Sequence, residues 1–313
     1  MSLAHLHSRA VGYGSVACQA QLARLAVLGV SHVALTPFAY VRGTDSTEFR
    51  YGDGLDSTLT DADLLETCRQ ARALGLQICV KPHVWSNAFW RGGGSRQEMT
   101  APAGDWDAWF AAYTGFAKHM AELAERGGAA LFVVGLEYLQ ATLAGGGRWA
   151  SVAEACRTVY GGALSYAANW WREAEAFEDW PAFDCVGVNA YHELDVGADP
   201  TVDELVAAWA RPLDGLVALG ERVGKPVVLT EVGLRAVAGA AAQPWNQGLA
   251  GPDDHDLQAR FYEAVLRAVA ARPQIRGLYW WKWFTDWERR ERDAYVPGEA
   301  AQAVVRAWWA AGR

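Results

Sequence analysis

Strand-length apolar runs alternate with amphipathic stretches along nearly all of the 313 residues, and this alternation constrains the fold more than any other feature. The apolar runs are rich in Val, Ile and Leu without regular polar alternation, as expected of parallel strands covered on both faces. Eight runs are predicted to form strands: Ser2–His7, His32–Phe38, Gln77–Trp85, Ala130–Glu137, Leu164–Trp170, Phe183–Tyr191, Pro226–Glu231 and Ile275–Phe284.

The stretches between these runs have the spacing of amphipathic helices. Helices are predicted at Ser15–Leu28, Asp61–Leu74, Trp106–Arg126, Ser151–Tyr160, Val202–Val223 and Asp254–Ala271. A glycine that can end a helix precedes the next strand at four places: Gly29, Gly75, Gly127 and Gly224. Eight strand–helix units predict an α/β fold, a single (β/α)8 TIM barrel that occupies residues 1–313 as one domain. A doubly wound sheet is the alternative, but no glycine-rich phosphate-binding motif follows the first strand.

Composition excludes several classes of partner. The formal net charge is −8 and the pI is about 5.4, which argues against nucleic acid, and no apolar stretch is long enough to span a membrane. The five cysteines are scattered without a C-x-x-C pair, so buried free thiols are expected rather than a zinc site or disulfides. No signal peptide is visible. We therefore expect a cytoplasmic protein as given, or a secreted one if an upstream segment is missing, and a monomer or weak oligomer.

Two of the apolar runs end in a glutamate, Glu137 and Glu231. A carboxylate at the end of a buried strand is costly to desolvate, so a chain rarely places one there without a purpose. Active sites of (β/α)8 barrels lie at the carboxyl ends of the strands. Cleavage of a glycosidic bond needs one protonated carboxyl group and one ionised carboxylate. Glu137 and Glu231 are therefore the candidate catalytic residues, and simple ion pairing at each strand end is the alternative.

The other strand ends carry aromatic, amide and basic side chains, which suit the binding of sugar hydroxyls and the flat faces of sugar rings. The candidate substrate-binding residues are His7, Phe38, Tyr40, Lys81, His83, Asn169, Trp170, Asn189, Tyr191, Trp280 and Trp281. Neighbouring residues on a strand point to opposite sides, so only one of the last two tryptophans is expected to face the cavity.

These residues resemble those of the clan A retaining glycoside hydrolases and, more narrowly, glycoside hydrolase family 113, which is best known for β-mannanases. The resemblance extends almost from end to end of the chain. It rests on Leu35–Phe38, Lys81–His83, Gly135–Glu137, Ala168–Trp170, Val186–Tyr191, Thr230–Gly233, Pro244–Trp245 and Gly277–Trp281.

The resemblance implies that Glu137 is the general acid/base and Glu231 the nucleophile of a double displacement. The two carboxyl groups would then lie about 5–5.5 Å apart. Tyr191 would hydrogen-bond the nucleophile, and Trp281 would lie under the reacting sugar. The implied substrate is a β-linked oligo- or polysaccharide, β-1,4-mannan or manno-oligosaccharides in the first place. The chemistry requires no cofactor and no metal.

One position departs from the clan pattern. Many clan A enzymes carry an asparagine directly before the acid/base, where it contacts the 2-hydroxyl of the sugar, and here that position is Leu136. Asn169 or His83 is expected to take over this contact. Lys81 lies two residues before His83, so both side chains are expected to point into the barrel mouth. Asn189 is expected to support the residues that touch the sugar.

Three other interpretations remain open. A metal-dependent hydrolase is suggested by His5 and His7, with His83 and His192 available, but the fifth and eighth strands lack the ligands that such barrels use. A non-catalytic carbohydrate binder has no need of both carboxylates. An exo-acting or other β-glycan hydrolase of the same clan would differ in the loops that close the cleft. The candidate closing loops are Thr44–Asp56, Asn87–Pro102 and Val237–Asp253.

Overall fold

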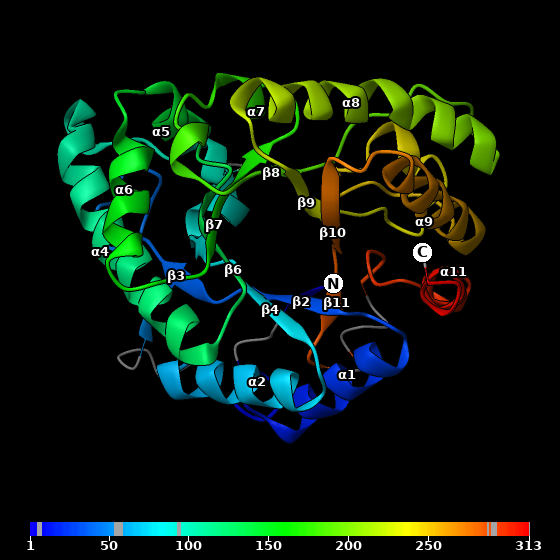
Figure 1. Ribbon diagram of the computed structural model, residues 1–313, viewed down its shortest axis with the longest axis horizontal. Coiled ribbons are helices and arrows are strands. Elements are labelled where there is room, and N and C mark those ends of the chain that lie inside the picture. The colour runs from blue at the N-terminus through cyan, green and yellow to red at the C-terminus, as the bar shows by residue number, and fades with distance from the viewer. Residues whose placement is uncertain (5–7, 53–58, 93–94, 287, 289–292, 313) are drawn as a thin grey trace.

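The computed structural model describes residues 1–4, 8–52, 59–92, 95–286, 288 and 293–312. Its main sheet is entirely parallel, in the order β10–β9–β8–β7–β6–β4–β2–β1–β11. These strands are β1 (Ser2–Ala4), β2 (His32–Leu35), β4 (Gln77–Val80), β6 (Leu131–Leu136), β7 (Ala163–Asn169), β8 (Cys185–Asn189), β9 (Val227–Val232), β10 (Ile275–Trp280) and β11 (Trp283–Phe284). Because β10 and β11 are successive parts of one segment and β11 pairs with β1, the sheet closes into a (β/α)8 barrel (Figure 1).

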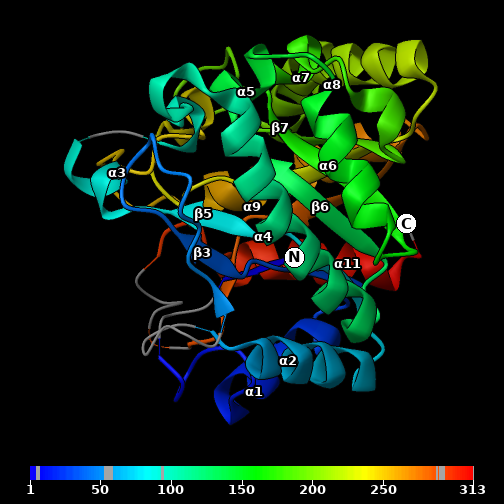
Figure 2. The ribbon, with the colours of Figure 1, turned by 90° about the vertical axis from the view of Figure 1, so that its left-hand side faces the viewer.

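Three predicted strands are each divided in two: Ile275–Phe284 forms β10 and β11, and each of the other two breaks lies at a proline. β3 (Phe38–Tyr40) continues β2 beyond Pro37, and β5 (His83–Trp85) continues β4 beyond Pro82. A proline cannot donate to a sheet, which explains the break in each strand. β3 and β5 pair in parallel as a separate small sheet. Figure 2 shows this small sheet on the side of the molecule opposite to α11 (Glu299–Ala310). The side with β3 and β5 is therefore the carboxyl end of the barrel strands.

Helices surround the barrel, and all six predicted helices are present with ends that differ by at most three residues. They are α1 (Val16–Val27), α2 (Asp61–Ala73), α4 (Trp106–Gly127), α6 (Arg148–Arg157), α8 (Val202–Val223) and α9 (His255–Ala270). The sequence did not predict α11 or the short helices α3 (Asn87–Gly92), α5 (Leu139–Leu143) and α7 (Glu173–Ala176). No helix in the described ranges is both long and apolar enough to cross a membrane.

The glycines that end the helices agree with the sequence at three of four places. The three have positive φ angles of 90°, 75° and 67°: Gly29, Gly75 and Gly224. The prediction for Gly127 was wrong, because it is the last residue of α4 and the following Gly128 takes the left-handed conformation, with φ 69°. A Cβ atom on Gly127 would lie 2.7 Å from Sγ of Cys68, so close packing of α4 on α2 accounts for this glycine.

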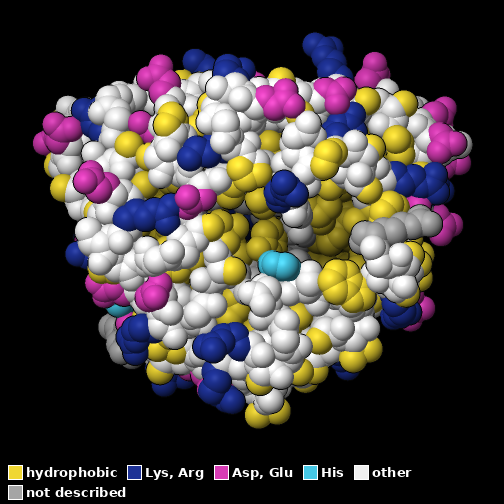
Figure 3. All heavy atoms as spheres, in the orientation of Figure 1, with side chains coloured by type: hydrophobic (Ala, Val, Ile, Leu, Met, Phe, Trp, Pro, Cys, Tyr) yellow, Lys and Arg dark blue, Asp and Glu magenta, His cyan; other side chains and the backbone are white. Residues whose placement is uncertain are grey.

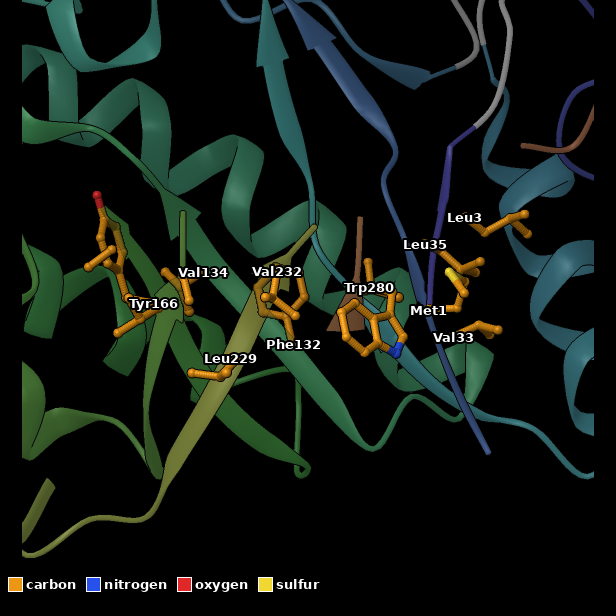
Figure 4. Close-up of a cluster of buried hydrophobic side chains, with 14 of the residues drawn as sticks. Met1, Leu3, Val33, Leu35, Phe132, Val134, Tyr166, Leu229, Val232 and Trp280 are labelled. Atoms are coloured by element: carbon orange, nitrogen blue, oxygen red, sulfur yellow. The ribbon is translucent and has the colours of Figure 1, made fainter. Parts of the chain in front are cut away.

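Alternation along the strands divides the apolar side chains into two sets. Outward-facing residues such as Leu35, Phe132 and Leu229 form one large cluster with the helices (Figure 4). The smaller set fills the barrel interior: Ala34, Cys79, Leu131, Val133, Leu136, Ala167, Cys185 and Tyr279. All five cysteines are buried and free, as the sequence predicted.

Candidate active site

The inward face of several strands continues beyond the apolar interior into polar side chains. Side chains two positions apart on a strand share a face. Lys81 follows Cys79 in this way, Asn169 follows Ala167, and Trp281 follows Tyr279. Asn189 follows Cys185 on the inward face of β8 and is the register partner of Asn169. Lys81, Asn169 and Asn189 have no exposed surface. Strand alternation therefore gathers these predicted residues at the mouth of the barrel.

Glu231 reaches the mouth through an irregularity in β9. Val188 of β8 pairs with Leu229, but the next residue, Asn189, pairs with Glu231, so β9 carries one extra residue at this point. Leu229 faces outward into the helical layer, and regular alternation would send Glu231 the same way. A bulge of this kind re-aims the side chain that follows it. The irregularity thus turns Glu231 toward the other strand ends.

Glu137 also follows an irregular stretch. The pairing of β6 with β7 shifts between Val133 and Leu136, directly before the glutamate. Glu137 itself has a positive φ of 57°, which is uncommon for a residue with a side chain and is often found at functional sites. Both candidate catalytic residues therefore lie at local departures from regular strand geometry.

Glu231 is buried, with 4% of its surface exposed, and two donors hold its carboxylate. Nζ of Lys81 lies 2.5 Å from Oε1, and the hydroxyl of Tyr191 donates to Oε2 at 2.7 Å. The contact expected between Tyr191 and Glu231 is thus present. Burial, and next the charge of Glu231, raise the pKa of Tyr191 well above its ordinary value, so its hydroxyl remains a donor. An ammonium and a hydroxyl on one carboxylate stabilise the anion.

Glu137 receives two hydrogen bonds from different elements. Nη2 of Arg96, in the 3-10 helix η2 (Arg96–Glu98), donates to Oε2 at 2.8 Å. Nδ2 of Asn189 donates to Oε1 at 2.9 Å, while Oδ1 of Asn189 accepts from the hydroxyl of Thr230 at 2.8 Å. Thr230 directly precedes Glu231. The Asn189 side chain therefore bridges the surroundings of the two glutamates.

The two consecutive tryptophans face different parts of the molecule. Trp281 stacks on His83, with ring centroids 5.7 Å apart and planes within 9° of parallel, and Nζ of Lys81 lies 5.4 Å from the Trp281 ring. Trp280 is buried and stacks on Tyr262 of α9, with a centroid distance of 3.7 Å. The structure thus brings Trp281 beside Lys81 and His83 and places Trp280 under a helix.

The remaining predicted aromatic residues form two groups around the site. Phe38 meets His83 edge to face at 5.5 Å, and Tyr40 lies 6.3 Å from Phe38. Trp170 meets Tyr191 edge to face at 5.8 Å. Phe38, Tyr40 and Trp170 are all half-buried, so each keeps some surface for contact with a ligand.

Three residues at the site were missed by the sequence predictions. Arg96 contacts Glu137, and Nε2 of Gln97 donates to Oδ1 of Asn169 at 3.2 Å. Both lie in the loop Asn87–Pro102, which the sequence did suggest as a closure but which has no periodicity to show where a side chain points. Glu173 accepts hydrogen bonds from Asn169. Its position near a helix start explains an acidic residue without reference to a site.

Of the four histidines that suggested a metal-dependent enzyme, the structure describes His83 and His192. His5 and His7 lie outside the described residues, and so does the predicted contact of His7 with substrate. His192 packs edge to face on Trp209 of α8, 5.8 Å between centroids, and burial lowers its pKa to about 4. Within the described ranges, no group of three or more His, Cys, Asp or Glu residues is placed to hold a metal ion.

A (β/α)8 barrel with two carboxylates, amides and aromatic rings at its strand ends belongs to the class of barrel glycoside hydrolases. The model of Glycoside Hydrolase Family 113 matches residues 2–297. The chain therefore belongs to glycoside hydrolase family 113, and the protein is a glycoside hydrolase.

Solved structures of the same family agree with this assignment. A GH113 β-mannanase from Alicyclobacillus acidocaldarius, in complex with ManMIm, is 27% identical, with a TM-score of 0.85 over 99% of this chain and 96% of that one. A GH113 β-1,4-mannanase is 25% identical, with a TM-score of 0.81 over 96% and 94% of the two chains. A GH5_18 protein from Streptomyces cattleya, 15% identical, shares the fold, with a TM-score of 0.64 over 100% of this chain and 80% of that one. No curated protein sequence matches the chain.

Proposed function

We propose that the protein is a retaining glycoside hydrolase that cleaves β-1,4-linked mannan or manno-oligosaccharides, with residues 1–313 acting as one catalytic domain. Family membership and the β-mannanase names of two similar structures support the substrate class. The observation that carries the mechanism is the bridge through Asn189, which contacts Glu137 with one end of its amide and Thr230, next to Glu231, with the other.

In the proposed first step, Glu231 attacks the anomeric carbon while Glu137 donates its proton to the departing glycosidic oxygen. The bond between the anomeric carbon and that oxygen breaks, and a covalent glycosyl–enzyme forms on Glu231. In the second step Glu137 removes a proton from water, which attacks the same carbon and releases Glu231 as a carboxylate. Two inversions give a product with the original anomeric configuration.

The contacts of the two glutamates suit these different roles. Lys81 and Tyr191 together stabilise the carboxylate of Glu231 that must attack. The contact of Arg96 with Glu137 suits the ionised base of the second step. For the first step Glu137 must carry a proton, so we propose that a sugar entering the site displaces the Arg96 side chain from this carboxyl group.

The proposal is tested by incubating the purified protein with β-1,4-manno- and gluco-oligosaccharides and following product size and anomeric form by NMR. We expect internal cleavage of manno-oligosaccharides with initial formation of the β-anomer. Release of single sugars from one end would keep the chemistry but make the enzyme exo-acting. Absence of turnover on every β-glycan by a folded protein would contradict the proposal in favour of a carbohydrate binder. Loss of activity on chelation would instead favour the metal-dependent alternative.

A further inference from the structure

Glu173 is a third buried carboxyl group close to the site, and the proposed reaction does not use it. It has no exposed surface, and four donors surround its two oxygens. The backbone N–H and Nδ2 of Asn169 both donate to Oε2 at 2.9 Å, while the hydroxyls of Tyr166 and Thr142 donate to Oε1 at 2.6 and 2.8 Å. All four of these donors are neutral groups. A buried carboxyl group without a cation is costly, and so calls for an explanation.

The hydrogen bonds of Glu173 fix which way the Asn169 amide points. Oε2 of Glu173 accepts from the backbone N–H of Asn169, and it remains an acceptor whether Glu173 is ionised or carries a proton on Oε1. The side chain of Asn169 therefore turns its NH2 group toward Glu173. Its Oδ1 then points away from Glu173 and accepts from Gln97. Asn169 follows Ala167 on the inward face of β7, and its register partner Asn189 contacts Glu137. The fixed acceptor oxygen therefore belongs to the inward face of β7, one strand away from the proposed acid/base.

We propose that Glu173 is a positioning residue that locks Asn169 with its carbonyl oxygen facing the cleft. In this orientation Asn169 accepts a hydrogen bond from a hydroxyl of the sugar at the cleavage point. This inference rests on the proposed function. The hydroxyl takes the place of Gln97, whose Nε2 donates to Oδ1 of Asn169 at 3.2 Å. Leu136, directly before Glu137, is buried and apolar and offers no polar contact.

The lock predicts different results for two substitutions of Glu173. In Glu173→Gln the amide oxygen keeps accepting from Asn169, and the NH2 group faces the hydroxyls of Tyr166 and Thr142, which can rotate to accept. In Glu173→Met, of similar length, Asn169 loses the acceptor that holds its orientation. We expect Glu173→Met to raise KM about tenfold, the worth of one hydrogen bond, with kcat changed much less, and Glu173→Gln to stay close to wild type.

The experiment measures kcat and KM for an aryl β-mannobioside and for analogues that lack the 2-, 3- or 6-hydroxyl of the sugar being cleaved. The account predicts that one analogue abolishes the difference between wild type and Glu173→Met, because that hydroxyl is the one Asn169 reads. Asn169→Ala, which leaves Glu173 in place, should show the same loss with the same analogue. This variant provides the test if Glu173→Met does not fold.

Two results would overturn the inference separately from the proposed function. The first is a wild type that turns over the mannobioside while Glu173→Met and Asn169→Ala remain equally impaired on every analogue. The same conclusion follows if both variants are as active as wild type on every substrate. In either case Asn169 binds none of these hydroxyls and the positioning role is wrong. If Glu173→Gln raised KM as much as Glu173→Met, the positioning role of Glu173 would also be contradicted. If wild type turns over no β-mannoside, the proposed function and the inference fail together.

Discussion

The two ends of the barrel are built from the same strands but differ in what the strands carry. At the carboxyl end of the strands, Lys81, Asn189 and Glu231 are buried. Lys81 donates to Glu231, and Asn189 accepts from Thr230, the residue before Glu231. At the opposite end, a cavity of about 530 Å³ opens under α11 and is lined by residues such as Leu131 and Trp308, with no carboxylate among them. Figure 3 shows an apolar hollow on this face.

This difference shows that cavity size alone does not mark a functional site in such a barrel. The walls of this cavity are mostly apolar side chains from the starts of the strands and from α11, with His32 and Arg276 among them. Buried ionisable groups, in contrast, cost free energy and persist where they serve a purpose. The comparison predicts that substitutions at the carboxyl end change the reaction, whereas those at the other end change mainly the stability of the fold.

The largest effect is expected from removal of the two glutamates. Glu231→Gln and Glu137→Gln should each lower kcat on manno-oligosaccharides, by about 10⁴-fold or more for the first and about 10²–10⁴-fold for the second. Circular dichroism and thermal unfolding should show that both variants remain folded. His32 is an exposed residue that lines the apolar cavity at the other end of the barrel. The variant His32→Gln is the matched control and should keep full activity. If either glutamate variant kept most of its activity, the role assigned to that residue would be wrong.

The consecutive tryptophans give the sharpest comparison between the two environments. Trp280→Ala removes a buried ring stacked on Tyr262 and should lower the free energy of unfolding by about 3–5 kcal/mol. Trp281→Ala removes the half-buried ring beside His83 and should instead raise KM about tenfold with less loss of stability. Urea denaturation and steady-state kinetics on both variants check this. The reverse order of effects would mean that Trp280 faces the sugar.

Removal of Lys81 tests how the buried charge at the carboxyl end is compensated. Lys81→Met leaves Glu231 without its cation and should lower the free energy of unfolding by about 3–5 kcal/mol. In the double variant Lys81→Met/Glu231→Gln the uncompensated charge is gone, so much of this loss should be recovered. Chemical denaturation of the two variants measures the difference. Equal instability of both would show that packing, and not charge, accounts for Lys81.

A smaller effect is expected from the titration of Glu173. Burial raises its pKa from 4.5 to about 7, and the charge of Glu137 acts in the same direction, while donation from Asn169, Tyr166 and Thr142 opposes it. The folded protein therefore binds a proton that the unfolded chain has released between pH 4.5 and about 7. Stability should fall as pH rises through this window, by about 3 kcal/mol at most, and level off above it.

The measurement for this prediction is the difference in free energy of unfolding between wild type and Glu173→Gln as a function of pH. The variant carries no titrating group at this position, so the component of the slope that comes from Glu173 should disappear. Identical pH profiles of the two proteins between pH 4.5 and 7 would show that Glu173 does not titrate in this range.

Much of this arrangement follows from strand alternation and could be predicted from the sequence. The positions of the strands, and of Lys81, Asn189 and Tyr191 at their ends, need only a period of two and the rule that barrel sites lie at strand carboxyl ends. That Trp280 and Trp281 face different ways follows from the same alternation, whereas the choice of Trp281 for the sugar came from the family resemblance. Strand alternation depends only on residues that are close in sequence, so it can be seen without knowledge of the fold.

The rest depends on geometry that no local pattern encodes. The irregular pairing in β9 turns the side chain of Glu231, and a bulge leaves no residue signature in this strand. Arg96 reaches Glu137 across 41 positions of sequence from a loop without periodicity. The glycine at position 127 is explained by packing against Cys68, a tertiary contact, and the left-handed residue that ends α4 is the following Gly128.

The most direct test of the central claim is azide rescue of alanine variants at the two glutamates with an activated aryl β-mannoside. If Glu231 is the nucleophile, azide attacks in its place in Glu231→Ala and gives the α-mannosyl azide. If Glu137 is the acid/base, Glu137→Ala still forms the glycosyl–enzyme, and azide then gives the β-mannosyl azide. NMR of the isolated products identifies the anomers. Exchanged anomers would reverse the two roles, and no rescue in either variant would contradict the double displacement.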